Sequence, residues 1–179
     1  ETVRKELLAL NELTQQKACE KIKRLEKEHG HRRSWVWARL EQSPLAIALD
    51  PLSRLAEATT SVIGGVSPDE MARTYLERGW QADAAAWEVL SKCLPGVESL
   101  LQKVVSHLLK PWLDDSARVF QEVIQKYPLP QRDEQTKVEV AENQCLLFAD
   151  GLRFDLGIKL QQLLEGRGGR VQLNHRWAA

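Results

Sequence analysis

A carboxylate stands at the end of a short, almost purely apolar run near residue 150. Cys145–Ala149 are apolar, and the run stops at Asp150, which is followed by Gly151. Runs of this kind are typical of strands buried inside a parallel sheet, and we predict a strand over residues 144–150. Asp150 would then lie at the carboxyl end of that strand, where open α/β sheets place the groups that bind ligands. The alternative is an ordinary turn, in which the Asp-Gly pair only reverses the chain.

The residues after this turn predict a helix and a second strand. Asp155 precedes a segment of helical apolar spacing, Leu156–Leu164, where a carboxylate can cap or charge-match the helix start. The glycine cluster at 166–169 ends that helix, and it lacks the Lys-Ser/Thr pair of a phosphate-binding loop. Val171–Leu173 then begins a second strand. Helix between two strands predicts the start of a βαβ unit, and two parallel strands alone do not make a stable sheet.

The long segment before this unit predicts an all-helical module. Apolar residues three and four apart predict one long amphipathic helix from residue 1 to about 29, which Gly30 ends. Ser67, Pro68 and Glu70 form a capping box, which is the clearest helix start in the chain. Leucine and valine stripes continue this spacing to about residue 127.

Prolines and one glycine are the predicted interruptions of the helices. Ser43 and Pro44 suit a helix start, and Pro51 predicts a kink or a break into two short helices. Gly79 is expected to interrupt the helix that follows the capping box. Pro111 is expected either to kink the next helix or to begin a new one, and we place Trp87 on an inward face.

These patterns predict a mainly α fold with two parts, an all-helical module followed by a unit that also contains strands. Residues 1–130 form the helical module, which ends in Pro128 and Pro130, and 131–137 form a connector rich in charge. Residues 138–179, beginning with Val138 and Val140, form the strand–helix–strand unit.

A basic segment offers a second kind of chemistry. The stretch from Lys21 to Arg39 carries seven basic residues against two acidic ones, and Trp35 and Trp37 lie within it. Basic side chains with aromatics can bind nucleic acid through phosphate contacts and stacking; the candidate residues are Lys21, Lys23, Arg24, Arg32 and Arg33. We favour the simpler interpretation of a solvated helix end followed by two tryptophans packed in the core. His29 and His31 are expected to be exposed, and His107 to have a packing or surface role.

Composition limits the class of protein further. The 179 residues carry 25 basic and 25 acidic side chains, a balance that argues against a dedicated nucleic-acid or membrane-surface module. Cys19, Cys93 and Cys145 are widely spaced and odd in number, so we expect free thiols and a cytoplasmic location. No segment approaches the roughly 20 apolar residues of a membrane span. Because the chain opens at Glu1 inside a helical pattern, we interpret it as an internal piece of a longer protein.

One stretch carries a family resemblance. Phe148–Asp155 reads F-A-D-G-L-R-F-D and resembles the first strand of the phosphatase-like domain in the PglZ family, within the alkaline-phosphatase superfamily. Residues 78–85 and 111–113 look like the helical region that precedes this domain, and 174–179 look like its second strand. The resemblance implies that residues 138–179 open an alkaline-phosphatase-like α/β domain.

The resemblance also implies a chemistry and a biological setting. In that superfamily the aspartate ending the first strand binds a metal, which assigns Asp150 as a ligand of Zn, Mn or Mg, with Arg153 and Asp155 in supporting roles. The nucleophile and the remaining ligands would follow Ala179, so we expect this stretch alone to be inactive and to hold no metal. The implied partners are other components of the BREX anti-phage defence system, including a DNA methyltransferase. The alternative from a different class is a non-catalytic helical interaction module.

Overall fold

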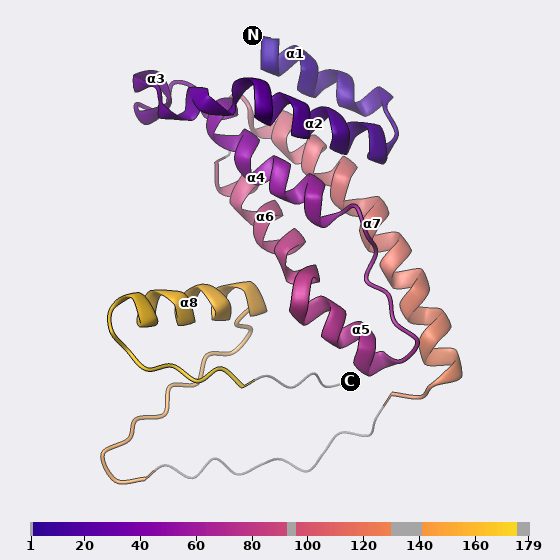
Figure 1. Cartoon of the computed structure of the whole chain (residues 1–179), viewed down its shortest axis with the longest axis vertical. Helices are drawn as coiled ribbons and strands as arrows, with labels where there is room; N and C mark the ends of the chain where they lie inside the picture. The colour runs from indigo at the N-terminus through magenta and orange to yellow at the C-terminus, as the bar shows by residue number, and fades with distance from the viewer. Residues whose placement is uncertain (1, 93–95, 130–140, 175–179) are drawn as a thin grey trace. The chain divides into compact units, whose positions relative to one another are not determined.

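The computed structural model of the chain describes residues 2–92, 96–129 and 141–174, which form helices and their connections (Figure 1). Helical residues make up 73% of this described part and no strand occurs in it, which confirms a mainly α fold class. The chain divides into two compact units, Glu1–Lys126 and Tyr127–Ala179.

The N-terminal segment is two helices and not the single long helix that the apolar spacing predicts. Helix α1, Thr2–Leu8, continues as the 3₁₀ turn Ala9–Glu12 and then stops, and α2 spans Gln15–His29. The break lies at Leu13 and Thr14, which are both extended. The Thr14 hydroxyl accepts a hydrogen bond from the Lys17 amide at 3.4 Å, so a local N-cap competes successfully with helix continuation here.

The first unit is organised around α4, Pro44–Ala58, which packs against α2, α6 (Trp80–Ser91) and α7 (Glu98–Lys126) (Figure 1). Because neighbours surround it, α4 is apolar on most of its circumference. Fully buried apolar side chains from all four helices join in one core: Ile22, Leu49, Leu52, Leu55, Ala82, Leu101 and Leu108.

Both long helices continue past their internal prolines. Helix α4 runs through Pro51, and α7 runs through Pro111, so neither proline breaks its helix. The residue after Pro111, Trp112, is 2% exposed, and its indole Nε1 donates a hydrogen bond to the Ser61 carbonyl at 2.8 Å. Although α7 has 29 residues, neither it nor any other helix in the described ranges is long and apolar enough to cross a bilayer.

The predicted capping box is confirmed at the start of α5, Pro68–Thr74. The Glu70 amide donates to the Ser67 hydroxyl at 3.3 Å, and the Glu70 carboxylate accepts from the Val66 amide at 2.9 Å. The predicted interruption at Gly79 is wrong, because a π-helical turn, Tyr75–Gly79, leads directly into α6. A Cβ at Gly79 would lie 2.8 Å from the Tyr75 ring and 2.9 Å from an Ile63 methyl, so close packing explains the glycine.

The inward face of α6 is made of small side chains and not of its tryptophan. Ala82, Ala85 and Ala86 are 0–4% exposed, whereas Trp87 is 53% exposed. The prediction that Trp87 points inward is therefore wrong. Alanines allow α4 to approach α6 closely, and an indole has no room on that face.

The second unit contains α8, Phe154–Gly166, but not the predicted strands. Residues 144–150 and Val171–Leu173 have no strand pairing in the described part of the chain, so the βαβ start is not formed there. A strand forms only beside a partner strand, and local apolar patterning cannot supply that partner. Val138, Val140, the connector 131–137 and the predicted strand residues after Asn174 lie outside the described residues.

Two cysteines are described, and both are free: Cys19 is buried, whereas Cys145 is exposed. Burial raises the pKa of the Cys19 thiol, and its sulfur lies 3.8 Å from the Thr59 hydroxyl oxygen. Cys93 lies outside the described residues.

We predict that removal of the Ser67 cap destabilises the first unit. Ser67→Ala should lower the free energy of unfolding by about 1 kcal/mol, because the Glu70 amide then loses its acceptor. Chemical denaturation followed by circular dichroism measures this. The control is Ser106→Ala, at an exposed site within α7, which should be neutral or slightly stabilising; equal losses in both variants would contradict the cap's role.

We also predict two classes of thiol reactivity. In the native protein an aromatic disulfide reagent should modify Cys145 quickly and Cys19 slowly, because Cys19 is buried and its thiolate is disfavoured. In denaturant all three cysteines should react without prior reduction. Fewer than three reactive thiols would reveal a disulfide and overturn the expectation of free cysteines.

Candidate functional site

The turn that carries Asp150 is shaped by the glycine beside it. Gly151 has φ +66°, a conformation that strongly favours glycine, and the chain turns there toward α8. Asp150 is exposed at this turn. The sharp turn that the sequence predicts at Gly151 is present, although the strand expected before it is absent from the described residues.

Arg153 and Asp155 form a two-pronged ion pair at the start of α8. The Arg153 Nε donates to one Asp155 carboxylate oxygen at 2.9 Å, and its Nη2 donates to the other at 2.7 Å. The Asp155 side chain is 2% exposed, and this Arg153 contact holds the pKa of its carboxyl below the ordinary value despite that burial. The pair therefore links the residue before the helix to its first turn, and the supporting roles that the resemblance implies for Arg153 and Asp155 stay a prediction.

The described residues do not by themselves make a metal site. Both Asp155 oxygens are engaged by Arg153, so Asp150 is the carboxylate of this turn that remains accessible. No group of three or more His, Cys, Asp or Glu side chains suited to a metal occurs in the described ranges. One carboxylate does not displace enough water from a divalent cation to hold it tightly. The expectation that this stretch alone binds no metal stays a prediction.

The basic segment is largely neutralised by carboxylates of the same unit. Four of its five candidate cations form ion pairs: Lys21 with Glu6, Lys23 with Glu57 at 2.6 Å, Arg24 with Glu28 at 3.8 Å, and Arg33 with Glu26 and with Asp50 at 3.5 Å. This pairing lowers the positive potential available to a nucleic-acid backbone. Arg32 differs, because it lies over an indole instead of beside a carboxylate: its Cζ is 5.7 Å from the Trp35 ring centroid.

Trp35 and Trp37 do not pack in the core, which corrects the interpretation we favoured from the sequence. They are 50% and 63% exposed, and Ala38 is the buried residue of the short helix α3, Val36–Arg39. The chain enters α3 from the 3₁₀ turn Gly30–Ser34, and a four-residue helix is too short to bury two indoles on one face.

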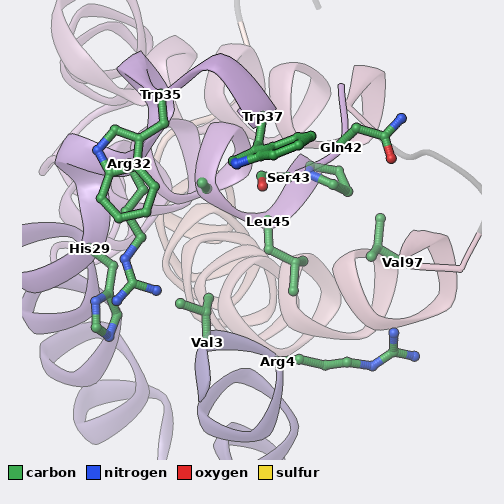
Figure 2. A pocket seen from close by; sticks show the side chains of 12 residues that line it. Val3, Arg4, His29, Arg32, Trp35, Trp37, Gln42, Ser43, Leu45 and Val97 are labelled. Atoms are coloured by element: carbon green, nitrogen blue, oxygen red, sulfur yellow. The ribbon is translucent and has the colours of Figure 1, made fainter. Parts of the chain in front are cut away.

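The two indoles instead border a hollow in the first unit, shown in Figure 2. We call it the Trp–Arg pocket and define it by five of its lining residues: Arg4, His29, Arg32, Trp35 and Trp37. Its volume is about 340 Å³, and Val3, Leu45 and Val97 supply apolar lining. In Figure 2 the Arg32 guanidinium lies between the rings of Trp35 and His29, and Arg4 lies apart from it, beyond Val3.

The pocket lining is cationic and contains unsatisfied polar atoms. It includes two guanidinium groups and one imidazole, and no carboxylate side chain is among its lining residues. The Arg32 Nε and the His29 Nδ1 are buried, and neither has a hydrogen-bond partner in the described part of the chain. His29 is half-buried and not exposed as predicted, whereas His31 is exposed as predicted.

Sequence reasoning missed this pocket for a definable reason. The basic residues and both tryptophans were visible in the sequence, but Arg4 and Val97 come from α1 and from just before α7. No local pattern predicts that these distant positions meet. The alternation of Trp35, Val36, Trp37 and Ala38 was the available signal, and we assigned it to the core.

Comparisons of the chain with known protein families, with curated proteins and with solved structures find no match in any of the three. The resemblance to the PglZ family therefore stays a prediction that depends on the motif residues of this chain.

We predict that the Asp155 pKa is set by Arg153. Arg153→Gln should raise that pKa toward its ordinary value, whereas Arg170→Gln, at an exposed site beyond α8, should leave it unchanged. Carboxyl ¹³C NMR titration measures both values. Because the folded pKa is the lower one, this pair stabilises α8 above the unfolded value of about 3.9, and the stabilisation is lost as pH falls through the folded pKa. An unshifted Asp155 pKa in Arg153→Gln would contradict the assignment.

Proposed function

We propose that this chain is part of a PglZ-like, metal-dependent phosphatase or phosphodiesterase in which Asp150 supplies one metal ligand. The observation that carries the proposal is an exposed apolar run leading into an exposed Asp-Gly turn. Leu146, Leu147 and Phe148 are 59%, 89% and 83% exposed, and Ala149 and then Asp150 follow them.

This exposure has a free-energy cost that points to missing neighbours. Each square ångström of apolar surface left in water forgoes roughly 25 cal/mol, and large exposed apolar patches mark surfaces that something covers. Helix α8 adds further exposed leucines to the same unit: Leu156, Leu160, Leu163 and Leu164. An apolar run and an apolar helix face in one unit are what the first strand and first helix of an α/β sheet require when further strands lie beside them.

The proposed chemistry needs groups outside the described residues. A divalent cation bound at this site would polarise a phosphoryl oxygen of the substrate. Asp150 contributes a hard oxygen ligand at an accessible position, and the bidentate Arg153–Asp155 pair fixes the chain that follows the turn. The remaining ligands and the Ser/Thr nucleophile belong, in this proposal, to sequence after Ala179.

The helical unit has a different role in the proposal. We place the intact protein in the cytoplasm as a member of a BREX-type defence system, with the first unit contacting other components such as a DNA methyltransferase. The unit supports such a role because it has its own apolar core and does not need the second unit to bury it. The alternative function, a non-catalytic interaction module, is favoured by the fact that the described residues contain no group of three or more His, Cys, Asp or Glu side chains suited to a metal.

We predict that Asp150→Asn in a protein extended beyond Ala179 reduces bound metal and phosphodiesterase activity by at least about 10- to 100-fold. Asparagine keeps the turn but removes the charge of one ligand. Metal content is measured by mass spectrometry and activity with bis(p-nitrophenyl) phosphate, with a thermal melt in parallel. The control, Glu142→Gln, alters an exposed carboxylate of the same unit and should change neither quantity.

Two outcomes bear against the proposal. Full activity and normal metal content in Asp150→Asn would overturn the ligand assignment. Extended protein that neither binds metal nor hydrolyses the ester, while remaining folded, would favour the interaction module. Residues 1–179 alone should hydrolyse no ester and bind Zn²⁺, Mn²⁺ or Mg²⁺ weakly.

A further inference from the structure

We infer that the Trp–Arg pocket binds a phosphorylated nucleoside, with the phosphate at Arg32 and the base against Trp35 or Trp37. This inference concerns the first unit alone and does not depend on the proposed role of Asp150. The ligand is either a free nucleotide or the phosphorylated end of a single strand, and both present the same chemistry.

The positive charges of the pocket lining favour an anionic ligand. Arg4, Arg32 and His29 line the pocket, and no carboxylate accompanies them. The other candidate cations of this region are engaged by carboxylates, whereas Arg32 contacts an indole face. A guanidinium presents a planar fork that matches phosphate oxygens, and a phosphate monoester carries close to two negative charges at neutral pH.

Buried atoms without partners point to the same ligand. The Arg32 Nε can only donate, yet it is buried and has no acceptor in the described part of the chain. The His29 Nδ1 beside it is also buried without a partner. Leaving such atoms unsatisfied costs free energy, so the protein alone does not complete the hydrogen bonding of Arg32 and His29.

The exposed indoles favour a ligand that carries a flat ring. Trp35 and Trp37 remain half or more exposed although each carries a large apolar surface. Indoles that border a cationic hollow are the usual platform for nucleobases, because every base presents a π-face that can stack. Gln42 and Ser43 lie next to Trp37 in Figure 2, and the Ser43 hydroxyl makes no capping hydrogen bond to α4. These two side chains can therefore bind polar edges of a base or sugar.

The size of the hollow agrees with one nucleotide. A volume of about 340 Å³ is near the lower end of the roughly 300–1,000 Å³ that small-molecule pockets occupy. The start of α4 also lines the pocket, at Ser43, Pro44 and Leu45, and the amino end of a helix carries partial positive charge. The described lining therefore combines cationic, aromatic and apolar side chains with the neutral polar Gln42 and Ser43.

The test is a titration of the chain with AMP, adenosine and inorganic phosphate, followed by calorimetry and tryptophan fluorescence. AMP should bind more tightly than either part alone. Arg32→Gln should weaken AMP binding at least about 10-fold, since a hydrogen bond to a charged group is lost, and Trp35→Ala at least about 5-fold. Arg32→Lys should restore only part of the affinity, because lysine keeps the charge but not the fork.

Matched controls separate the pocket from general surface effects. Arg118→Gln removes an exposed arginine of α7, and Trp87→Ala removes an exposed indole of α6; both lie outside the pocket and should leave AMP binding unchanged. Circular dichroism melts check that every variant is folded. If Arg32→Gln unfolds the chain, His29→Gln serves as the second test of the anion site, because the His29 ring lies beside the Arg32 guanidinium in Figure 2.

Short oligonucleotides identify the source of the ligand. A 5′-phosphorylated single strand that binds more tightly than AMP, and more tightly than its unphosphorylated form, indicates a strand end; preference for AMP indicates a free nucleotide. Either result supports the inference when Arg32→Gln abolishes it. The inference is overturned if AMP does not bind at millimolar concentration, if adenosine binds as well as AMP, or if Arg118→Gln has the same effect as Arg32→Gln.

Discussion

The burial of α4 is the constraint on which the first unit depends. Leu49, Leu52 and Leu55 are fully buried, and helices lie against several sides of this one helix. Each such leucine stabilises the fold by roughly 1.5–3 kcal/mol, so the surrounding helices are held mainly by their contacts with α4. The segment after α4 is then fastened to α7 by two hydrogen bonds, Trp112 Nε1 to the Ser61 carbonyl at 2.8 Å and the Ile63 amide to the Ser116 hydroxyl at 3.1 Å.

The same helix sets the position of the Trp–Arg pocket. Its first residues form one wall, while α1 and the segment between α2 and α4 supply Arg4, Arg32 and both indoles. The indoles have no place in a core already filled by leucine and alanine, so the chain leaves them at the surface. Ion pairs engage Lys21, Lys23, Arg24 and Arg33 nearby, whereas Arg32 lies over Trp35. Packing of the core thus determines which charges face the hollow.

The features that sequence predicted well are those decided within a few residues. The Ser67 capping box and the Asp-Gly turn depend on neighbours that the sequence displays. The errors at Leu13–Thr14 and Gly79 are also local. At each position continuation of the helix competes with its interruption, and the spacing of apolar residues alone does not reveal which is more stable. The prediction that Trp87 points inward was wrong because alanines occupy the buried face of α6. The pocket could not be predicted, since its walls are brought together only by tertiary packing.

The prediction of a strand over residues 144–150 was wrong for a further reason. The local pattern of apolar residues indicates that burial of Leu147 and Phe148 would be favourable. In a sheet that burial comes from neighbouring strands, which the local pattern does not contain. In the second unit these side chains are exposed, while the Arg153–Asp155 pair at the start of α8 is formed and Asp155 is buried. A carboxylate held this way is stabilised by its arginine two residues away and needs no sheet. The turn that presents Asp150 therefore depends on local contacts, the left-handed conformation of Gly151 and the Arg153–Asp155 pair, and its geometry does not require a sheet.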